Sequence, residues 1–521
     1  MKSIFNLLVV ICVSCTAMAQ EQKRPNIVFI FSDDHAVKAL SAYDDTLMQT
    51  PNIDRIAKKG MRFDRAYVGN AVCGPSRATL LTGKHSHANG YETNDWSGEF
   101  NGHQETLPKL LQQSGYKTAV FGKWHLMSDP VGFDDWSVID NVMEQGTYYN
   151  PSFRSPAGIK ETTGYVAEIV TDQTISWLKN QKQSEQPFLL MYNHKSPHRD
   201  WIPAPQELAE WDESATLPEP NTLLRSMDGL SEARQNSRMS IADDMTDLDV
   251  KLSEPSSMNE EQLKLWEATF AKGNEEFENA DLTDDEITRW KYQRYIKTYT
   301  GSVKSMDREI GRLLDYLEAN NLDENTIIIY SSDQGFYLGE NGWFDKRWIN
   351  DVSSKIPLLI QWPNHIKEGS STSALVQNID FAPTLLDAAG VEIPEAMQGI
   401  SLLPVLTDDE FEPQSRDLYY QFYENPGFHG VARHYGIISE RYKLANFYNN
   451  EEWELFDTQT DPDEQINLYG QPGYEKVTAD LKQRLLSLRA QYKVPSTDDD
   501  PQPPWYYSTL IRVVEMIMGW M

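Results

Sequence analysis

Two short apolar runs that each end in polar oxygen-bearing residues constrain the fold of this chain more than any other feature. The runs cover Ile27–Phe31 and Thr326–Tyr330. The residues that follow them are Asp33 and Asp34 in the first case, and Asp333 and Gln334 in the second. Runs that are apolar throughout are typical of strands buried in a parallel sheet with helices on both faces. Ligands of such sheets bind beyond the carboxyl ends of the strands, so these residues are candidates for a binding site.

Further apolar runs alternate with helical patterns along the first 406 residues. Strands are expected at Thr118–Gly122, Phe188–His194 and Pro357–Pro363, and a helix at Trp290–Ala319, where apolar residues recur at helical spacing. The alternation predicts an α/β fold with a large domain, residues 20–406, built on a mostly parallel central sheet flanked by helices.

The segment from about residue 207 to 286 is acidic and polar and has no strand pattern. This composition favours a surface insertion of short helices over a lid that faces the substrate.

From residue 407 the sequence changes character. Three stretches resemble antiparallel strands, and an amphipathic helix follows them, so residues 407–521 are expected to form a small C-terminal α+β domain with an antiparallel sheet. The apolar tail that ends the chain is short and carries Arg512 and Glu515. A packed helix is therefore favoured over a transmembrane anchor.

Residues 1–19 have the layout of a signal peptide, with one lysine, a short apolar run and an Ala-Met-Ala end. A lipid anchor on Cys15 is the alternative, but Cys12 stands where such signals have an apolar residue. Removal of the segment would leave Cys73 as the last of three cysteines, which excludes a disulfide within one chain. We expect a periplasmic or secreted protein.

The net charge of −31 argues against nucleic acid as a partner, because binding to nucleic acid depends on clustered lysine and arginine. An anionic substrate would need a local cationic pocket that works against the overall field.

Cys73 begins the block Cys-Gly-Pro-Ser-Arg, which is followed by Leu-Thr-Gly at residues 81–83. This block resembles the signature of the type I sulfatases, the formylglycine-dependent branch of the alkaline phosphatase superfamily. The resemblance implies that a maturation enzyme oxidises Cys73 to formylglycine. The hydrated aldehyde has two hydroxyls on one carbon: one attacks sulfur, and the other then expels sulfate, so the covalent intermediate clears itself.

The same resemblance assigns one Ca²⁺ ion to the two strand ends. Its ligands would be Asp33, Asp34, Asp333, Gln334 and an oxygen of the modified residue 73. Hard oxygen ligands suit this cation better than a thiophilic metal. The cation would polarise the sulfate and stabilise the ionised hydroxyl.

Three further segments resemble family motifs. By that resemblance, Lys123 contacts the substrate and the modified residue, while His125 hydrogen-bonds the hydrated aldehyde and can act as a base in the elimination step. His198 would bind the ester oxygen and protonate the leaving alcohol. His194 is the competing candidate, and the proline before His198 favours the latter. Lys346 would contact a sulfate oxygen.

Arg77 would hold the modified side chain and a metal ligand through forked hydrogen bonds, and with the two lysines it would make the pocket positive. Asn341 departs from the family, which usually has histidine there, at a place expected to touch the sugar. Trp201 and Trp343 suit sugar stacking and core packing equally well.

The resemblance therefore implies an exported sulfatase that acts on a sulfated oligosaccharide or polysaccharide, with its catalytic domain over residues 20–406. Ulvan-like algal polysaccharides and glycosaminoglycans are both candidate substrates. The alternatives are a phosphonate or phosphodiester hydrolase of the same superfamily and a catalytically inactive carbohydrate-binding protein. A two-metal phosphatase is disfavoured because no second cluster of metal ligands is evident near Asp333.

Overall fold

A computed structural model of the chain describes residues 23–497 except 95–97, 183, 226–229 and 426, and beyond residue 497 it describes only positions 509 and 513. The expected signal peptide, with Cys12 and Cys15, lies outside the described residues, as does most of the apolar tail. Of the helices within the described part of the chain, none is long and apolar enough to cross a membrane.

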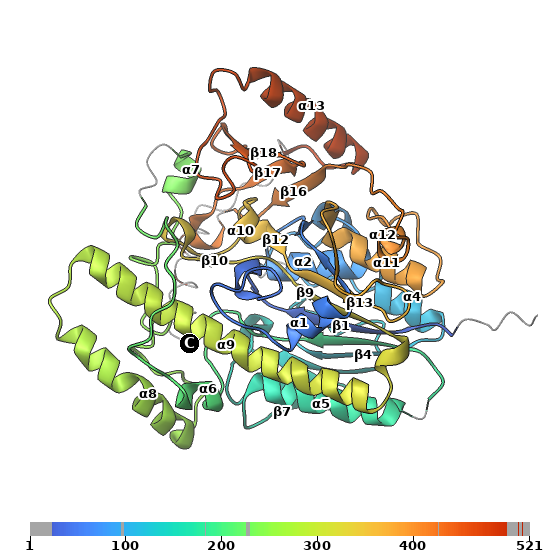
Figure 1. The fold of residues 1–521 in the computed structure, drawn as a ribbon, viewed down its shortest axis with the longest axis horizontal. Helices are drawn as coiled ribbons and strands as arrows, with labels where there is room; N and C mark the ends of the chain where they lie inside the picture. The colour runs from blue at the N-terminus through green and yellow to red at the C-terminus, as the bar shows by residue number, and fades with distance from the viewer. Residues whose placement is uncertain are drawn as a thin grey trace, which may run out of the picture.

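A ten-stranded sheet forms the centre of the molecule (Figure 1). Its strands, in spatial order, are β14 (Ser370–Thr372), β2 (Met61–Phe63), β13 (Leu358–Gln361), β9 (Thr326–Ser332), β1 (Asn26–Ser32), β8 (Phe188–Asn193), β4 (Lys117–Gly122), β5 (Asp135–Asp140), β6 (Ser152–Ser155) and β7 (Gly158–Glu161). The central strands from β9 to β5 are parallel. The α/β prediction is therefore confirmed.

One expected strand runs in the opposite direction to its neighbour. The apolar run near Pro357–Pro363 forms β13, and β13 pairs antiparallel with β9. An apolar run predicts a buried strand, but the direction of the strand depends on the connection that leads into it.

Helices cover both faces of the sheet because the side chains of β1 alternate between them. Ile27, Phe29 and Phe31 belong to one apolar core, and Val28 and Ile30 belong to a second core on the opposite face. The helices of the first core are α2 (Cys73–Thr82), α4 (Leu107–Gln113) and α11 (Phe381–Ala388). Those of the second are α1 (Ile53–Lys58), α5 (Val166–Gln181) and α9 (Asp284–Ala319).

Helix α9 is longer than the sequence pattern predicts. Its first turn is closed by a capping box in which Thr283 and Glu286 satisfy each other's backbone N–H groups, so the helix begins at Asp284 rather than at Trp290.

The remaining short elements connect the layers. They are the strands β3 (Ala66–Tyr67), β10 (Tyr337–Leu338), β11 (Phe344–Asp345), β12 (Lys355–Ile356) and β15 (Val376–Gln377), and the helices α3 (Ser86–Asn89), α10 (Asp351–Ser354) and α12 (Leu403–Thr407).

The C-terminal part contains the expected antiparallel sheet, drawn in red in Figure 1. Its strands are β16 (Leu418–Phe422), β17 (His434–Ile438), β18 (Tyr442–Phe447) and β19 (Glu452–Asp457). Helix α13 (Glu475–Gln491) covers one face through Leu481 and Leu485, while Leu418 and Phe422 on the other face join the first core of the large sheet. The predicted small α+β unit is present, and its opposite face packs onto the large domain.

The acidic segment contains α6 (Pro205–Ala209), α7 (Glu232–Gln235) and α8 (Glu260–Glu278), and no strand among its described residues. It is not confined to the surface. Met239 belongs to the first core, and Asp249 is fully buried and pairs with Arg199. Buried apolar and ionic contacts therefore anchor parts of this segment to the body of the protein.

Candidate functional site

The two polar strand ends meet at one edge of the sheet. Strands β1 and β9 are parallel and in register, with Ser32 opposite Ser332, so the residues that follow them leave the sheet side by side. The carboxylate oxygens of Asp33, Asp34 and Asp333 lie within 4.8 Å of one another. The backbone N–H of Asp34 donates to Asp333 Oδ1 at 3.1 Å, which ties the two strand ends together.

Each of the three carboxylates accepts hydrogen bonds from a different buried cation. The pairs are Lys123 with Asp33, Lys346 with Asp34 at 2.7 Å, and Arg77 with Asp333 at 2.8 Å. With the carboxylates ionised, three negative charges face three positive ones. A dication bound to the carboxylates would leave the site with a net positive charge, which suits an anionic substrate.

The cluster has the features of a site for a hard cation. Within the described part of the chain, Asp33 Oδ1 and Gln334 Oε1 are buried without a hydrogen-bond partner, and such atoms are rare in folded proteins. Burial, with repulsion from neighbouring carboxylates, raises the pKa of Asp34 to about 6 and the pKa of Asp333 well above its usual range. A dication bound to these oxygens would relieve both effects, and an all-oxygen donor set fits Ca²⁺.

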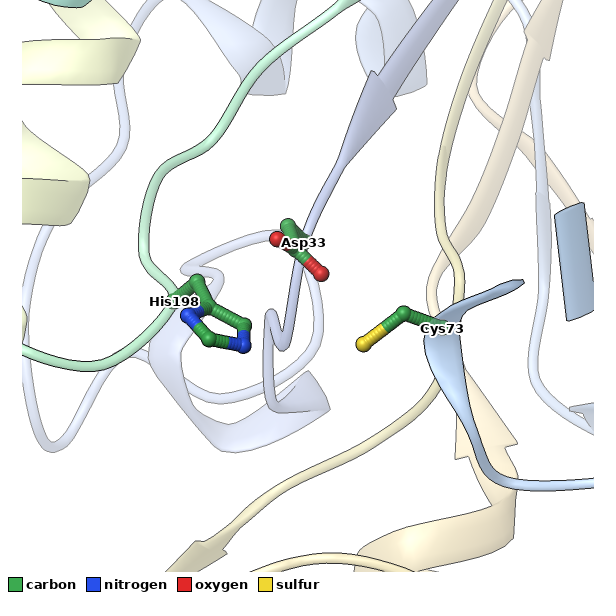
Figure 2. A group of neighbouring side chains, drawn as sticks. All are labelled: Asp33, Cys73 and His198. Carbon is green, nitrogen blue, oxygen red and sulfur yellow. The ribbon is translucent and has the colours of Figure 1, made fainter. Parts of the chain in front are cut away.

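Cys73 stands at the first position of α2, and its thiol faces the carboxylates. The sulfur accepts a hydrogen bond from Gln334 Nε2 at 3.4 Å. The side chains of Cys73, Asp33 and His198 point toward a common space (Figure 2), and their ligand atoms lie within 4.8 Å of one another. Burial raises the pKa of the thiol. Unmodified Cys73 is therefore a protonated thiol and a poor nucleophile.

Lys123 reaches the cluster because of the residue before it. Gly122 ends β4 with a φ of 99°, and a Cβ at this position would lie 1.8 Å from the carbonyl oxygen of Asn193. Only glycine can turn the chain here. The turn directs the ammonium of Lys123 toward Asp33.

The structure brings His198, and not His194, to the cluster. His198 Nε2 lies 3.7 Å from Asp34 Oδ2, and Nδ1 lies 2.7 Å from the carbonyl oxygen of Arg199. Because a carbonyl only accepts, Nδ1 carries the proton, and Nε2 faces the site. His194 is buried against Tyr192. Burial and then Lys123 hold the pKa of His198 well below its usual range, so its ring is neutral when no substrate is bound.

The cluster opens into two small adjoining cavities of about 80 and 130 Å³, which share Gln145, His198 and Arg199. Cys73 and Lys346 line the smaller one. Larger hollows of about 640 and 680 Å³ lie elsewhere on the described surface and contain none of the clustered carboxylates. The chemistry of the lining, rather than its volume, identifies the site.

The mouth of the smaller cavity contains polar residues that sequence reasoning missed. Asp345 accepts a hydrogen bond from Arg347, and His429 Nε2 lies 3.1 Å from Asp345 Oδ2. Asp345 and Arg347 flank Lys346 in the sequence, so their position next to it was a usable signal. His429 lies in the loop between β16 and β17 of the C-terminal part, and no local pattern marks it.

The structure shows where three residues considered for the sugar-binding surface lie. Asn341 accepts a hydrogen bond from Gln465 and donates its backbone N–H to Thr222, and it lines neither cavity. Trp201 is 0% exposed and Trp343 is 4% exposed, and both pack in the core. Neither tryptophan is therefore available to stack on a sugar.

Comparison with known proteins agrees with this geometry. Residues 25–391 match the family described as Sulfatase, and residues 339–491 match the family described as N-sulphoglucosamine sulphohydrolase, C-terminal. The chain is 44% identical to the N-acetylglucosamine-6-O-sulfatase of Bacteroides thetaiotaomicron, over 92% of this chain and 88% of that protein. An ulvan-active sulfatase of Formosa agariphila is 25% identical, over 91% of this chain and 83% of that protein.

A solved structure of a protein in complex with its substrate, D-glucosamine-2-N,6-O-disulfate, superimposes on the chain with a TM-score of 0.88. The two sequences are 44% identical, and the match covers 92% of this chain and all of the other.

Proposed function

This chain belongs to the sulfatase family and hydrolyses sulfate esters of carbohydrates, and from that premise we propose that it removes the 6-O-sulfate of a glucosamine residue. The observation that carries the proposal is the 44% identity, over 92% of the chain, to an N-acetylglucosamine-6-O-sulfatase. The weaker identity of 25% to an ulvan-active sulfatase favours glycosaminoglycan over ulvan among the two candidate sources.

The mouth of the cavity supports a sugar substrate. Lys346 holds Asp34 on the inner side, while Asp345, Arg347 and His429 present carboxylate, guanidinium and imidazole groups on the outer side. Such groups form paired hydrogen bonds with sugar hydroxyls. The buried ammonium of Lys346 would bind the sulfate group.

We also propose that Cys73 is converted to formylglycine and that Asp33, Asp34, Asp333, Gln334 and residue 73 hold one Ca²⁺ ion. The aldehyde hydrate supplies a nucleophile that releases its own sulfate, and the cation supplies Lewis acidity. The unpartnered Asp33 Oδ1 and Gln334 Oε1 support the metal. The position of Cys73, within reach of Asp33 and Gln334, supports the modification.

The residues of the chain divide the remaining work. Lys123 and Lys346 are placed to hold sulfate oxygens, and Arg77 fixes Asp333. A 6-O-sulfate leaves a primary alcohol, which is a poor leaving group and needs a proton. His198 is proposed as the acid: Nδ1 keeps its proton on a backbone carbonyl, and Nε2, which faces the cluster, would take up a proton from solvent when the anionic ester binds and pass it to the leaving oxygen.

Sulfate release from a defined panel of substrates tests this function. The panel contains glucosamine 6-O-sulfate in N-acetylated and N-sulfated forms, the galactosamine 6-O-sulfate epimer, ulvan oligosaccharides, an aryl sulfate and an aryl phosphodiester. We expect the highest kcat/KM on the glucosamine compounds. A preference for the phosphodiester would support a phosphodiester hydrolase instead, and no release from any ester would support the inactive binding protein.

Two further measurements test the maturation steps. Peptide mass spectrometry around position 73 should find the aldehyde, and recovery of an unmodified thiol from fully active enzyme would overturn that assignment. Sequencing of the exported protein should place its first residue at about position 20, after the proposed signal peptide. We propose periplasmic or secreted export on this basis, and an intact residue 1 would contradict it.

A further inference from the structure

Gln145 connects the two basic residues that follow β4. Its side-chain oxygen Oε1 accepts a hydrogen bond from Lys123 Nζ at 2.8 Å, and its side-chain nitrogen Nε2 lies 3.1 Å from His125 Nε2. Lys123 and His125 are both buried, at 0% and 1% exposure. Gln145 also lines both cavities of the site. It belongs to none of the motifs that indicated the site in the sequence.

The charge of Lys123 determines which way the amide of Gln145 faces. An ammonium group has three donors and no acceptor, so it requires the oxygen of the amide. The opposite orientation would place the amide N–H groups 2.8 Å from a buried positive charge. The nitrogen of the amide is therefore turned toward His125.

The amide in turn determines the proton on His125. An amide nitrogen only donates, so His125 Nε2 must accept and carries no proton. A neutral ring then carries its proton on Nδ1. Burial, followed by the charge of Lys123, lowers the pKa of His125 well below its usual range, which agrees with a neutral ring. Within the described part of the chain, Nδ1 is buried and has no hydrogen-bond partner.

We infer that Gln145 is a positioning residue that holds the proton of His125 on Nδ1, so that this ring enters the reaction as a hydrogen-bond donor. The inference rests on the proposed function, because it assigns the free N–H to an oxygen of residue 73 or of bound sulfate. A donor directed at a developing negative charge stabilises it without taking up a proton. The family resemblance implies a basic role for His125 instead, and the two roles predict different outcomes for the variants below.

The tautomer can be measured without substrate. Long-range ¹H–¹⁵N spectra of the full-length enzyme labelled with ¹⁵N-histidine distinguish a protonated Nδ1 from a protonated Nε2. The chain has ten histidines, and the His125→Asn variant identifies the signal by its loss. We expect the Nδ1–H form in the wild type and its loss in Gln145→Glu, whose carboxylate still accepts from Lys123 but cannot donate to His125. An Nε2–H form in the wild type would overturn the inference.

Steady-state kinetics test whether the tautomer of His125 affects the reaction. Gln145→Glu should lower kcat by about 100-fold with KM changed less than about threefold, because the ring is misdirected while the sulfate-binding cations remain. The exposed Gln471→Glu is the matched control for the added charge, and we expect its kinetics to equal those of the wild type. An equal loss in both variants, or a Gln145→Glu defect confined to KM, would contradict a positioning role.

Two replacements of His125 separate a donor from a base. Asparagine tolerates the left-handed backbone of this position, where φ is 57°, and its side-chain nitrogen can occupy the place of Nδ1–H. His125→Asn should therefore keep at least ten times the kcat of His125→Ala, whereas a base role predicts that both lose activity equally. These outcomes test the role of His125 alone. If the inference fails but the wild type releases sulfate, the proposed function still holds.

Discussion

Arg77 donates two hydrogen bonds to the same oxygen of Asp333, from Nε at 3.0 Å and from Nη2 at 2.8 Å. Its third nitrogen, Nη1, donates to the backbone carbonyl of Lys123 at 2.8 Å. One guanidinium thus joins the end of β9 to the turn after β4. Both side chains are almost fully buried, at 3% and 0% exposure.

Replacement of this guanidinium by an ammonium should lower the stability of the folded protein. Arg77→Lys keeps the charge but cannot make all three hydrogen bonds, and we expect the free energy of unfolding to fall by about 3 kcal/mol. Denaturant titration measures the change. Arg62→Lys is the matched control, because its pair with Asp64 is more than one-third exposed and should change stability by less than about 0.5 kcal/mol. Equal effects at the two positions would contradict this account of Arg77.

Cys73→Ala should abolish sulfate release and leave the fold intact. The residue is buried at the start of α2, where alanine fits and no ion pair is lost. Sulfate release and a thermal melt of the same preparation check the two parts. Residual turnover above about one-thousandth of the wild type would count against residue 73 as the nucleophile.

Chelation should lower the melting temperature of the wild type. A cation that binds only the native state adds its binding free energy to stability, about 2.7 kcal/mol at a concentration 100-fold above its Kd. Melting curves with chelator, and again after Ca²⁺ is restored, measure this. Asp34→Asn removes a proposed ligand, so its melting temperature should respond much less. The calcium site would be ruled out by identical curves with and without chelator and no metal in elemental analysis.

The two neighbouring histidines should respond differently to replacement. His198→Ala should reduce kcat by about 100-fold or more on a sugar 6-O-sulfate and much less on an activated aryl sulfate, because only the poor leaving group needs a proton. His194→Leu should leave both activities close to those of the wild type, since His194 packs against Tyr192 and does not belong to the clustered ligand atoms that include His198. If His198→Ala affected both substrates equally, it would not be the acid.

Buried His194 should make stability depend on pH. Burial lowers its pKa to about 3, from about 6.5 in an unfolded chain. Between these values the unfolded chain binds a proton that the folded protein excludes, so the free energy of unfolding falls as pH falls, by at most about 1.4 kcal/mol per pH unit. Denaturant titrations at pH 7, 6 and 5 should show a shallower fall in His194→Leu, and parallel curves would refute this origin.

The features that sequence reasoning predicted are local ones. The runs before Asp33 and Asp333 are apolar enough to identify buried strands, and parallel strands bring their ends to one edge, so the cluster of carboxylates follows from short stretches of sequence. The block at Cys73 and the lysines after strand ends are local in the same sense.

What sequence reasoning missed depends on contacts between distant segments. His429 meets Asp345 although they are 84 positions apart, and Gln145 meets His125 although strand β5 lies between them in the sequence. Trp201 is buried because α9 and the strands β10 and β11 cover it, which composition alone could not indicate. The direction of β13 likewise follows from the route of the chain and not from its apolar residues.

The loop that carries His429 also rests on the acidic segment, through the backbone N–H of Arg238, which donates to the carbonyl of His429 at 2.6 Å. The side of the smaller cavity that contains His429 is thus built from loops. The carboxylate cluster instead follows the ends of strands β1 and β9. Substitutions in the loop of His429 would leave the strand ends, and the carboxylates that follow them, in place. A lineage could acquire a new sugar preference through a few loop exchanges and keep the chemistry it inherited.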